Sequence, residues 1–579
     1  MLLPLQGAAL GDPPRDSPAG ARRSPEPERP PPEGPKGALA GRPASHLCSV
    51  IKYSFAMRNK GSLRTEEPIL DGKLSCDYLV LGGGTAGAVV AARLAEETEA
   101  EVVLVEAGPS DEGDWRVLEL WNWPNLLGTD FDYDYTIEPQ ERGNSLIRHS
   151  RGKVLGGCSS HNSAIAFRAP DYDLEVWERS GAAGWGPEGT RPYYDRVFDR
   201  VHVETIPPDN TCTAAFVEAA VQAGYPLIRF NEEELREGVG WLQINARAGI
   251  RQSSSVAYLH PLGRLPNLTV LTETRVLRVL LDGGGEAVGA ETSRGTIRAR
   301  GEVILCCGAF DSPKLLMLSG IGPEEHLREA GVPCRVDLPG VGEHLLDHPE
   351  GVVIWEASRP IPPISRQGWE AALFARVDPA SEVPDLMFHF GTSAFDINTS
   401  QLGYPSAEHA FSLTPNVMRA RSEGFVRLRS SDPAAPPVID FRYFTDPDGY
   451  DDWIMTEGVK LARRIAEQPA LRPWVRRELA PGPNVRDDGQ VSEYARRSAN
   501  TVYHPAGTCR MGAPDDPAAV VDPQLRVRGV GRLRVADASV FPTMIGTNPC
   551  ITCMMIGEKC ADLVLGADAG TLQPRELAR

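Results

Sequence analysis

Short apolar runs bounded by glycine and polar residues mark the first patterned part of the chain. Residues 77–81 form one such run, and residues 102–106 form a second that ends on an acid. A run of this length is typical of a strand buried within a parallel sheet. Residues 88–97, between the two runs, have a helix-forming composition. The pattern predicts a strand, a helix and a second strand within about thirty residues.

The turn between the first strand and the helix carries glycines at the spacing G-x-G-x-x-G, namely Gly82, Gly84 and Gly87. Gly82 permits a tight turn, Gly84 lets backbone N–H groups approach a pyrophosphate, and Gly87 lets the helix pack closely on the strand. The helix N-terminus attracts phosphate charge, and Glu106 can accept hydrogen bonds from both ribose hydroxyls of an adenosine. The sequence therefore predicts a dinucleotide site, although the motif alone does not separate FAD from NAD.

The two ends of the chain lack such patterning. The first fifty residues hold eleven prolines and no Phe, Trp or Tyr. Such a segment cannot bury enough apolar surface to offset the entropy of ordering it. We expect residues 1–70 to be a disordered proline-rich extension and residues 571–579 to be a flexible C-terminus. Helical patterns are predicted at residues 450–467 and 552–565.

Composition and charge narrow the classes of function. The chain has 579 residues, 41% of them hydrophobic, and a net charge of −18, which indicates a globular protein of more than one domain. The acidic balance argues against nucleic acid and against a surface for anionic lipid. The eleven cysteines are odd in number and lie mostly in apolar or glycine-rich runs, unlike the disulfide framework of a small secreted protein. We expect a cytoplasmic protein that binds neither nucleic acid nor a membrane.

Further segments carry candidate chemistry. They read, in order, RGKVLGGCSSHNS at 151–163, GAFDSPKLLMLSGIGP at 308–323, HPAGTCRMG at 504–512, VADASVFP at 535–542, and Asn548 with Pro549. Together with the glycine turn, these segments resemble the glucose–methanol–choline (GMC) family of flavin oxidoreductases. The resemblance extends from about Cys76 to about Leu565 and keeps the family's order of motifs.

The resemblance implies an α/β fold of the GMC type. A Rossmann-like FAD-binding domain would be interleaved with a substrate domain that contains a mixed β-sheet. The FAD-binding domain would comprise residues 75–205, 241–348 and 501–570. The substrate-binding domain would comprise residues 206–240 and 349–500.

The resemblance also implies FAD as the cofactor, attached covalently through His161. Family members that oxidise choline carry this link in the matching Gly-Gly-Cys-Ser-Ser-His block, and covalent attachment raises the potential of a flavin. Besides His161, the residues that the resemblance places around FAD are Gly82, Gly84, Thr85, Ala86, Gly87, Glu106, Val154, Gly157, Cys158, Asn162, Val276, Asp537, Ala538, Asn548 and Pro549.

Several blocks look closest to the choline-oxidising members of the family. This implies oxidation of choline to betaine aldehyde and on to glycine betaine, with O2 reduced to H2O2 at each step. His504 and Asn548 match the pair that lines the substrate face of the flavin, where an imidazole can take the hydroxyl proton and an amide can orient the oxygen. His389 matches a histidine that helps to hold the alkoxide, and Ser163 would face the reactive edge of the flavin.

Choline carries a positive charge that the binding site must hold. A trimethylammonium group has no N–H donor, so a protein can hold it only with an anion and with aromatic faces. Glu350 stands where the choline-oxidising members have their substrate-binding carboxylate. Trp123, Trp369 and Tyr503 match the aromatic positions around the cation. The resemblance therefore implies choline, or a similar small primary alcohol, as the substrate.

Several alternatives remain open at this point. A choline dehydrogenase with an acceptor other than oxygen shares the same residues but typically lacks the flavin-linking histidine, so His161 favours an oxidase. An oxidase for another primary or amino alcohol, or a flavin-fold binding protein without activity, is also compatible with the fold. The resemblance further implies a homodimer.

Two further patterns have simpler explanations. His344 and His348 are four residues apart, a spacing that can bind a metal on a helix, but no third ligand is apparent and we expect no metal. Cys550 and Cys553 form a C-x-x-C pattern, and Cys550 replaces the Asn of the resembled oxidases. We interpret both as small apolar residues beside Asn548 rather than as a redox pair.

Overall fold

The computed structural model describes residues 70–363 and 365–566. These residues all belong to one compact unit, Ala44–Arg579. The predicted disordered extension, up to residue 69, and the predicted flexible C-terminus at 571–579 lie outside the described residues. Among the residues described, no helix is both long and apolar enough to cross a membrane.

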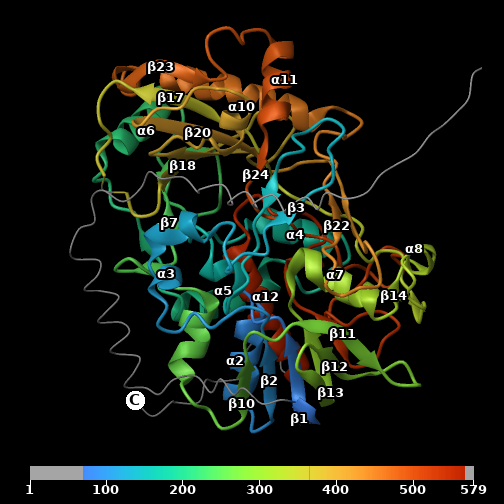
Figure 1. Ribbon diagram of the computed structural model, residues 1–579. Helices are drawn as coiled ribbons and strands as arrows, with labels where there is room; N and C mark the ends of the chain where they lie inside the picture. The colour runs from blue at the N-terminus through green and yellow to red at the C-terminus, as the bar shows by residue number, and fades with distance from the viewer. Residues whose placement is uncertain (1–69, 364, 567–579) are drawn as a thin grey trace, which may run out of the picture. The chain divides into compact units, whose positions relative to one another are not determined.

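A seven-stranded sheet forms one end of this unit (Figure 1). Its order is β10-β2-β1-β13-β12-β11, and β25 pairs with the end of β13. The strands β10, β2, β1, β13 and β25 are parallel, whereas β12 and β11 run antiparallel to their neighbours. The strands are β1 (Leu70–Leu81), β2 (Val102–Val105), β10 (Leu268–Leu271), β11 (Val276–Leu281), β12 (Ala287–Thr292), β13 (Gly295–Leu305) and β25 (Leu533–Val535).

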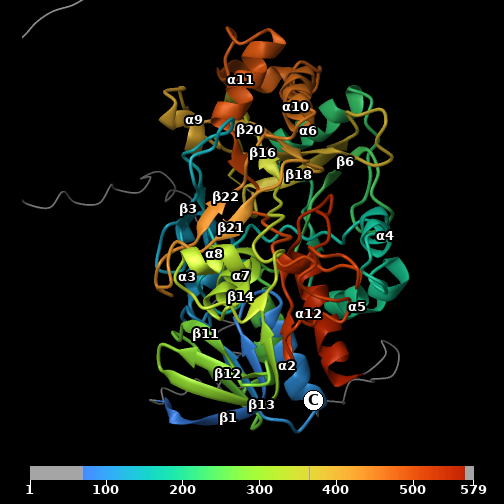
Figure 2. The same cartoon turned by 90° about the vertical axis from the view of Figure 1, so that its right-hand side faces the viewer.

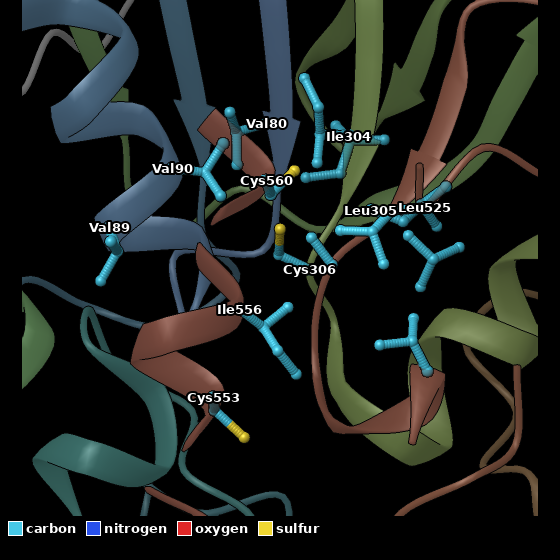
Figure 3. Packing of buried hydrophobic residues seen from close by; sticks show 14 of the residues in the cluster. Val80, Val89, Val90, Ile304, Leu305, Cys306, Leu525, Cys553, Ile556 and Cys560 are labelled. Atoms are coloured by element: carbon cyan, nitrogen blue, oxygen red, sulfur yellow. The ribbon is translucent and has the colours of Figure 1, made fainter. Parts of the chain in front are cut away.

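Helices α2 (Gly87–Glu97) and α12 (Cys550–Leu565) pack against each other beside this sheet. They approach closely because Gly557 has no side chain: an added Cβ would lie 2.7 Å from the Ala86 carbonyl oxygen. Figure 3 shows side chains from the strands and from α12 gathered in one layer, among them Val80, Ile304, Cys306, Ile556 and Cys560. The predicted strand–helix–strand unit and the helix predicted at 552–565 are confirmed.

An eight-stranded sheet forms the opposite end (Figures 1 and 2). Its order is β23-β17-β20-β19-β18-β6, with β16 between β20 and β24. Its strands are β6 (Gly238–Trp241), β16 (Pro349–Glu350), β17 (Val353–Ala357), β18 (Trp369–Ala375), β19 (Leu386–Gly391), β20 (Ala410–Val417), β23 (Val475–Ala480) and β24 (Asn500–Thr501). Helices α6 (Thr211–Gln222), α10 (Tyr450–Ala466) and α11 (Asp488–Ser498) lie at this end.

The fold class is confirmed. The sheet that contains both parallel and antiparallel pairs, however, is not the one that we expected. The paired strands of the eight-stranded sheet are antiparallel, with one parallel bridge, Leu227 to Val239, at the β6 edge. No helix lies between β18 and β19, and only the five-residue helix α9 (Ile397–Gln401) lies between β19 and β20; such short connections favour antiparallel neighbours. The mixed sheet is the seven-stranded one.

The remaining elements are short or lie between the sheets. They are α3 (Trp115–Leu118), α4 (Asp171–Arg179), α5 (Pro187–Arg200), α7 (Gly308–Leu318), α8 (Glu324–Glu329), α9 (Ile397–Gln401), β3 (Tyr135–Thr136), β4 (Arg148–His149), β5 (Glu204–Thr205), β7 (Gln243–Ile244), β8 (Ala246–Arg247), β9 (Ile250–Arg251), β14 (Ile321–Gly322), β15 (Val336–Asp337), β21 (Phe425–Arg427) and β22 (Val438–Asp440). Strands from separate parts of the chain belong to each sheet. The predicted domain boundaries stay a prediction.

Candidate active site

A cavity of about 540 Å³ collects nearly all of the predicted site residues. Its lining includes the glycine turn, the end of β2, the segment 150–163, and residues of β16, β18 and β19. The predicted residues that line it are Gly82, Gly84, Thr85, Ala86, Glu106, Trp123, Gly157, Cys158, His161, Asn162, Ser163, Val276, Glu350, Trp369, His389, Tyr503, His504, Asp537, Ala538, Asn548 and Pro549.

Two predicted cofactor residues do not line the cavity. Gly87 faces the turn instead, where an added Cβ would lie 1.9 Å from the Gly82 carbonyl oxygen. This contact agrees with a packing role for the third glycine of the motif. Val154 is fully buried in a small apolar cluster with Leu126 and Phe131, so its side chain serves packing there.

The glycine turn exposes its backbone to the cavity. Gly82 has a φ of +100°, and an added Cβ would lie 2.5 Å from the Cys306 carbonyl oxygen. Gly84 lines the cavity, and the protein atoms nearest to an added Cβ are 3.7 Å away. A side chain at Gly84 would therefore be tolerated by the protein itself but would meet a ligand approaching the backbone, as the motif predicts.

Glu106 lies immediately after β2 and is held by backbone donors. The N–H of Gly83 donates to Oε2 at 2.9 Å, and the N–H of Gly108 donates to Oε1 at 2.8 Å. Burial raises the pKa of this carboxyl group to about 7. Each oxygen keeps a second lone pair, so Glu106 can also accept hydrogen bonds from ligand hydroxyls in the cavity.

The segment before His161 places that imidazole at the cavity wall. Gly156 and Gly157 adopt φ values of +85° and +52°, and a short 3₁₀ turn over Gly157–Ser160 leads into His161. The imidazole is buried, and burial lowers its pKa to about 4. Its Nε2 has no hydrogen-bond partner within the described residues, and the nearest Asp132 oxygen is 4.0 Å away. A neutral imidazole with an unpaired nitrogen is a candidate for the predicted covalent link to the flavin.

A hydrogen bond to a second buried histidine, His348, fixes which ring nitrogen of His504 carries the proton. The Nε2 of His348 lies 3.0 Å from the Ile545 carbonyl oxygen, which only accepts, so His348 carries its proton on Nε2. Burial lowers the pKa of His348 to about 3, which leaves its Nδ1 unprotonated. The Nδ1 of His504, 2.9 Å away, must then be the donor. The remaining Nε2 of His504 is an acceptor that faces Asn548 Nδ2 at 3.3 Å.

His389 carries its proton on the other ring nitrogen from His504. It lies on β19, and Asn416 of the adjacent β20 donates through Nδ2 to its Nδ1 at 3.0 Å. Burial lowers the pKa of His389 to about 4, so the ring is neutral and its proton is on Nε2. In the part of the chain that the structure describes, this Nε2 has no hydrogen-bond partner. Of these two residues, His504 therefore presents an imidazole acceptor to the cavity and His389 an imidazole donor.

Glu350 supplies a buried carboxyl group to the same cavity. It lies on β16 between β20 and β24, and the amide of Asn500 donates to its Oε2 at 3.3 Å. Burial raises its pKa to about 8. Among the described residues, no Lys, Arg or His forms an ion pair with it. An acid buried without a counter-charge is stabilised in its charged form by a bound cation.

Aromatic rings line the same cavity as this acid and the two histidines. The Trp369 ring lies 5.8 Å from the His389 ring, and the Trp123 indole donates to the Gln367 carbonyl oxygen at 2.8 Å. Tyr503 also lines the cavity. The sequence analysis missed Phe395, which lines the cavity and packs edge-on against Trp369 with ring centres 5.2 Å apart. Only its place shortly after β19 could have indicated it.

The residues of the two competing patterns have other partners in the described part of the chain. His344 bonds to Glu423 and the Pro542 carbonyl, whereas His348 bonds to His504 and Ile545. No group of three or more metal-binding side chains gathers anywhere in residues 70–363 and 365–566. The cysteines of these ranges are all free thiols, and burial raises the pKa of Cys550 to about 12.

Comparison with known proteins places the whole arrangement among flavin enzymes. Family models described as GMC oxidoreductase match residues 76–350 and 420–557. A choline oxidase from Arthrobacter globiformis is 50% identical over 520 residues, which cover 85% of this chain and 95% of that protein. An oxygen-dependent choline dehydrogenase from Sinorhizobium medicae is 35% identical over 536 residues, or 85% and 96% of the two chains.

Solved structures agree with this placement. Pyridoxine 4-oxidase from Mesorbium loti superposes with a TM-score of 0.76 at 31% identity, covering 84% of this chain and 98% of that one. A formate oxidase from Aspergillus oryzae superposes with a TM-score of 0.77 at 25% identity, covering 85% and 98%.

Proposed function

The chain belongs to the GMC oxidoreductase family, and we propose that it is a FAD-dependent choline oxidase. It oxidises the primary alcohol of choline to betaine aldehyde and the hydrated aldehyde to glycine betaine, and O2 accepts the electrons and becomes H2O2. The observation that carries this proposal is a buried Glu350, without an ion-pair partner among the described residues, in the same aromatic cavity as His389, His504 and Asn548. The 50% identity to a choline oxidase supports it.

FAD is the cofactor, and the residues present fit it. The open backbone at Gly84, the ribose acceptor Glu106 and the unpaired Nε2 of His161 line one continuous cavity. The glycine turn and the start of α2 would hold the pyrophosphate, and Glu106 the adenosine ribose. We propose that His161 carries the covalent link. Bound FAD supplies the acceptor for the hydride that leaves the alcohol carbon.

The side chains of the cavity bind and activate the alcohol. Glu350, once ionised, holds the trimethylammonium group among Trp123, Trp369 and Tyr503, a surface that also excludes water. The lone pair of His504 Nε2, which accepts from Asn548 Nδ2 at 3.3 Å, takes the hydroxyl proton once that amide turns to the substrate oxygen. The N–H of His389 Nε2 and the amide of Asn548 then donate to the alkoxide oxygen and hold it in place.

The same groups serve the second oxidation. A hydrated aldehyde presents a hydroxyl on the carbon that carried the first one, so His504 can again accept its proton and Glu350 can hold the unchanged cation. The homodimer implied by the family resemblance and the cytoplasmic location expected from the sequence stay predictions.

Oxygen consumption tests this function. With choline, the enzyme is expected to consume two O2 and to release two H2O2 per molecule, and betaine aldehyde alone should support half of that. Oxidation of choline that reduces an artificial dye but consumes no O2 would favour the dehydrogenase. No turnover of choline with either acceptor would contradict the proposed substrate.

A further inference from the structure

A buried arginine lies behind the segment that carries His161. Arg251 ends β9 and is fully buried. Its Nε donates to the Val117 carbonyl oxygen at 3.2 Å, and its Nη1 donates to the Ser159 carbonyl oxygen at 3.3 Å and to the backbone carbonyl of Asn162. Within residues 70–363 and 365–566, no carboxylate forms an ion pair with it, and its Nη2 has no hydrogen-bond partner.

This setting differs from that of Arg93, which is also buried. Arg93 contacts Glu97, Glu558 and Asp562, so its charge is balanced. Arg251 has only neutral oxygen acceptors, and burial lowers its pKa to about 9. A buried guanidinium without a counter-charge is costly, and packing alone could be served by an apolar side chain of similar size. Its donors must therefore serve the segment that they contact.

The contacts of Arg251 bracket His161. Ser159 lies two residues before it and Asn162 one residue after it, and the same Nη1 also reaches the Asn162 side-chain oxygen at 3.0 Å. That oxygen accepts from the Ala164 backbone N–H as well, at 3.0 Å. The Nη1 of the guanidinium thus contacts the backbone on both sides of His161 while its Nε is anchored on Val117, and a single Lys ammonium cannot reproduce these two separate donor nitrogens.

We propose that Arg251 is a positioning residue that holds residues 159–163 in the conformation in which His161 Nε2 can bond to the flavin. The inference rests on the proposed covalent attachment at His161. That attachment joins Nε2 to a methyl carbon of the flavin ring. The imidazole and the methyl group each lose one hydrogen, and O2 takes both hydrogens with their two electrons to give H2O2.

Three variants and two readouts test this role. R251M removes the guanidinium and R251K keeps the charge without the fork, while R247M alters an exposed arginine on the preceding strand β8. The readouts are the fraction of flavin that stays with acid-precipitated protein and the Tm. We expect the covalent fraction of R251M and R251K to be at least about twofold below that of the wild type. R247M should match the wild type.

The outcomes separate the inference from the function. A wild-type covalent fraction in R251K and R251M, even with a lowered Tm, would overturn the positioning role. If R251M does not fold, R251K decides. A wild-type enzyme that oxidises choline but releases all its flavin on precipitation would overturn both the attachment and this inference, while leaving the choline oxidase proposal standing.

Discussion

The two ends of the cavity contain similar acids in different surroundings. Glu106 and Glu350 are both buried, and burial raises the pKa of each, to about 7 and about 8. Glu106 accepts two backbone N–H groups at 2.9 and 2.8 Å. Glu350 accepts one amide at 3.3 Å and has no ion-pair partner among the described residues. Glu106 is already satisfied by the protein, whereas Glu350 lacks the positive charge that a substrate could supply.

The same contrast extends to the residues around each acid. The cofactor end is built from the backbone of a few consecutive residues, so its geometry depends on which positions are glycine. The substrate end is built from side chains of β16, β19 and the segment after β24, which meet only in the folded protein. Substitutions at the first end should therefore abolish the folded holoenzyme, whereas substitutions at the second should alter kinetics and leave the fold intact.

The largest effect is expected for Gly87→Ala. The added Cβ would lie 1.9 Å from the Gly82 carbonyl oxygen, so the turn and α2 cannot both keep their places. We expect little or no flavin-loaded protein, measured as the ratio of flavin to protein after purification. Gly283→Ala is the control, because nothing lies within 4 Å of its added Cβ. A normal flavin content in Gly87→Ala would show that the turn does not depend on this close contact.

The next largest effect is expected for His504→Ala, which removes the acceptor for the hydroxyl proton. We expect kcat/KM for choline to fall by about 10² to 10⁴, the usual contribution of a general base, with a normal flavin content. His202→Ala alters an exposed imidazole outside the cavity and should keep wild-type kinetics. A His504→Ala variant with a loss of less than about tenfold would argue against a base at this position.

Glu350→Gln should have a smaller effect that depends on the substrate. Loss of the counter-charge should cost about 2 kcal/mol or more, which is roughly a thirtyfold lower kcat/KM for choline. For the neutral analogue 3,3-dimethylbutanol, which has carbon in place of nitrogen, the loss should be minor. Glu382→Gln, at an exposed acid, is the control. Equal losses for both alcohols would mean that Glu350 does not bind the cation.

A further prediction concerns the pH dependence of cation binding. The pKa of Glu350 in the fold, about 8, exceeds its ordinary value of 4.5. Its neutral form therefore contributes stability that is complete below pH 4.5 and is lost as the pH rises through 8. A bound cation favours the ionised form, so tetramethylammonium should bind more tightly at pH 9 than at pH 6, by up to about tenfold per pH unit below 8.

The rise in Tm caused by tetramethylammonium measures this dependence. The rise should grow from pH 6 to pH 9 in the wild type, and Glu350→Gln should show little rise at either pH. A rise in the wild type that does not change with pH would place the relevant pKa elsewhere.

The strand, helix and strand at the cofactor end were predicted from the sequence, because a glycine turn between two buried strands is a local signal. The positions of Glu350, His389 and His504 came from resemblance and not from any local pattern. The roles of His348 and Asn416 were not predicted, since each acts on a histidine of a different segment or strand. The antiparallel pairing of β18 to β20 was also missed, because pairing direction depends on how the connections fold back.

The most direct test compares initial rates of O2 consumption with choline and with 3,3-dimethylbutanol under identical conditions. The two alcohols have nearly the same shape and differ in the positive charge that Glu350 would meet. If Glu350 holds the cation, kcat/KM for choline should be at least about thirtyfold higher than for 3,3-dimethylbutanol. Equal values for the two alcohols would contradict this role of Glu350.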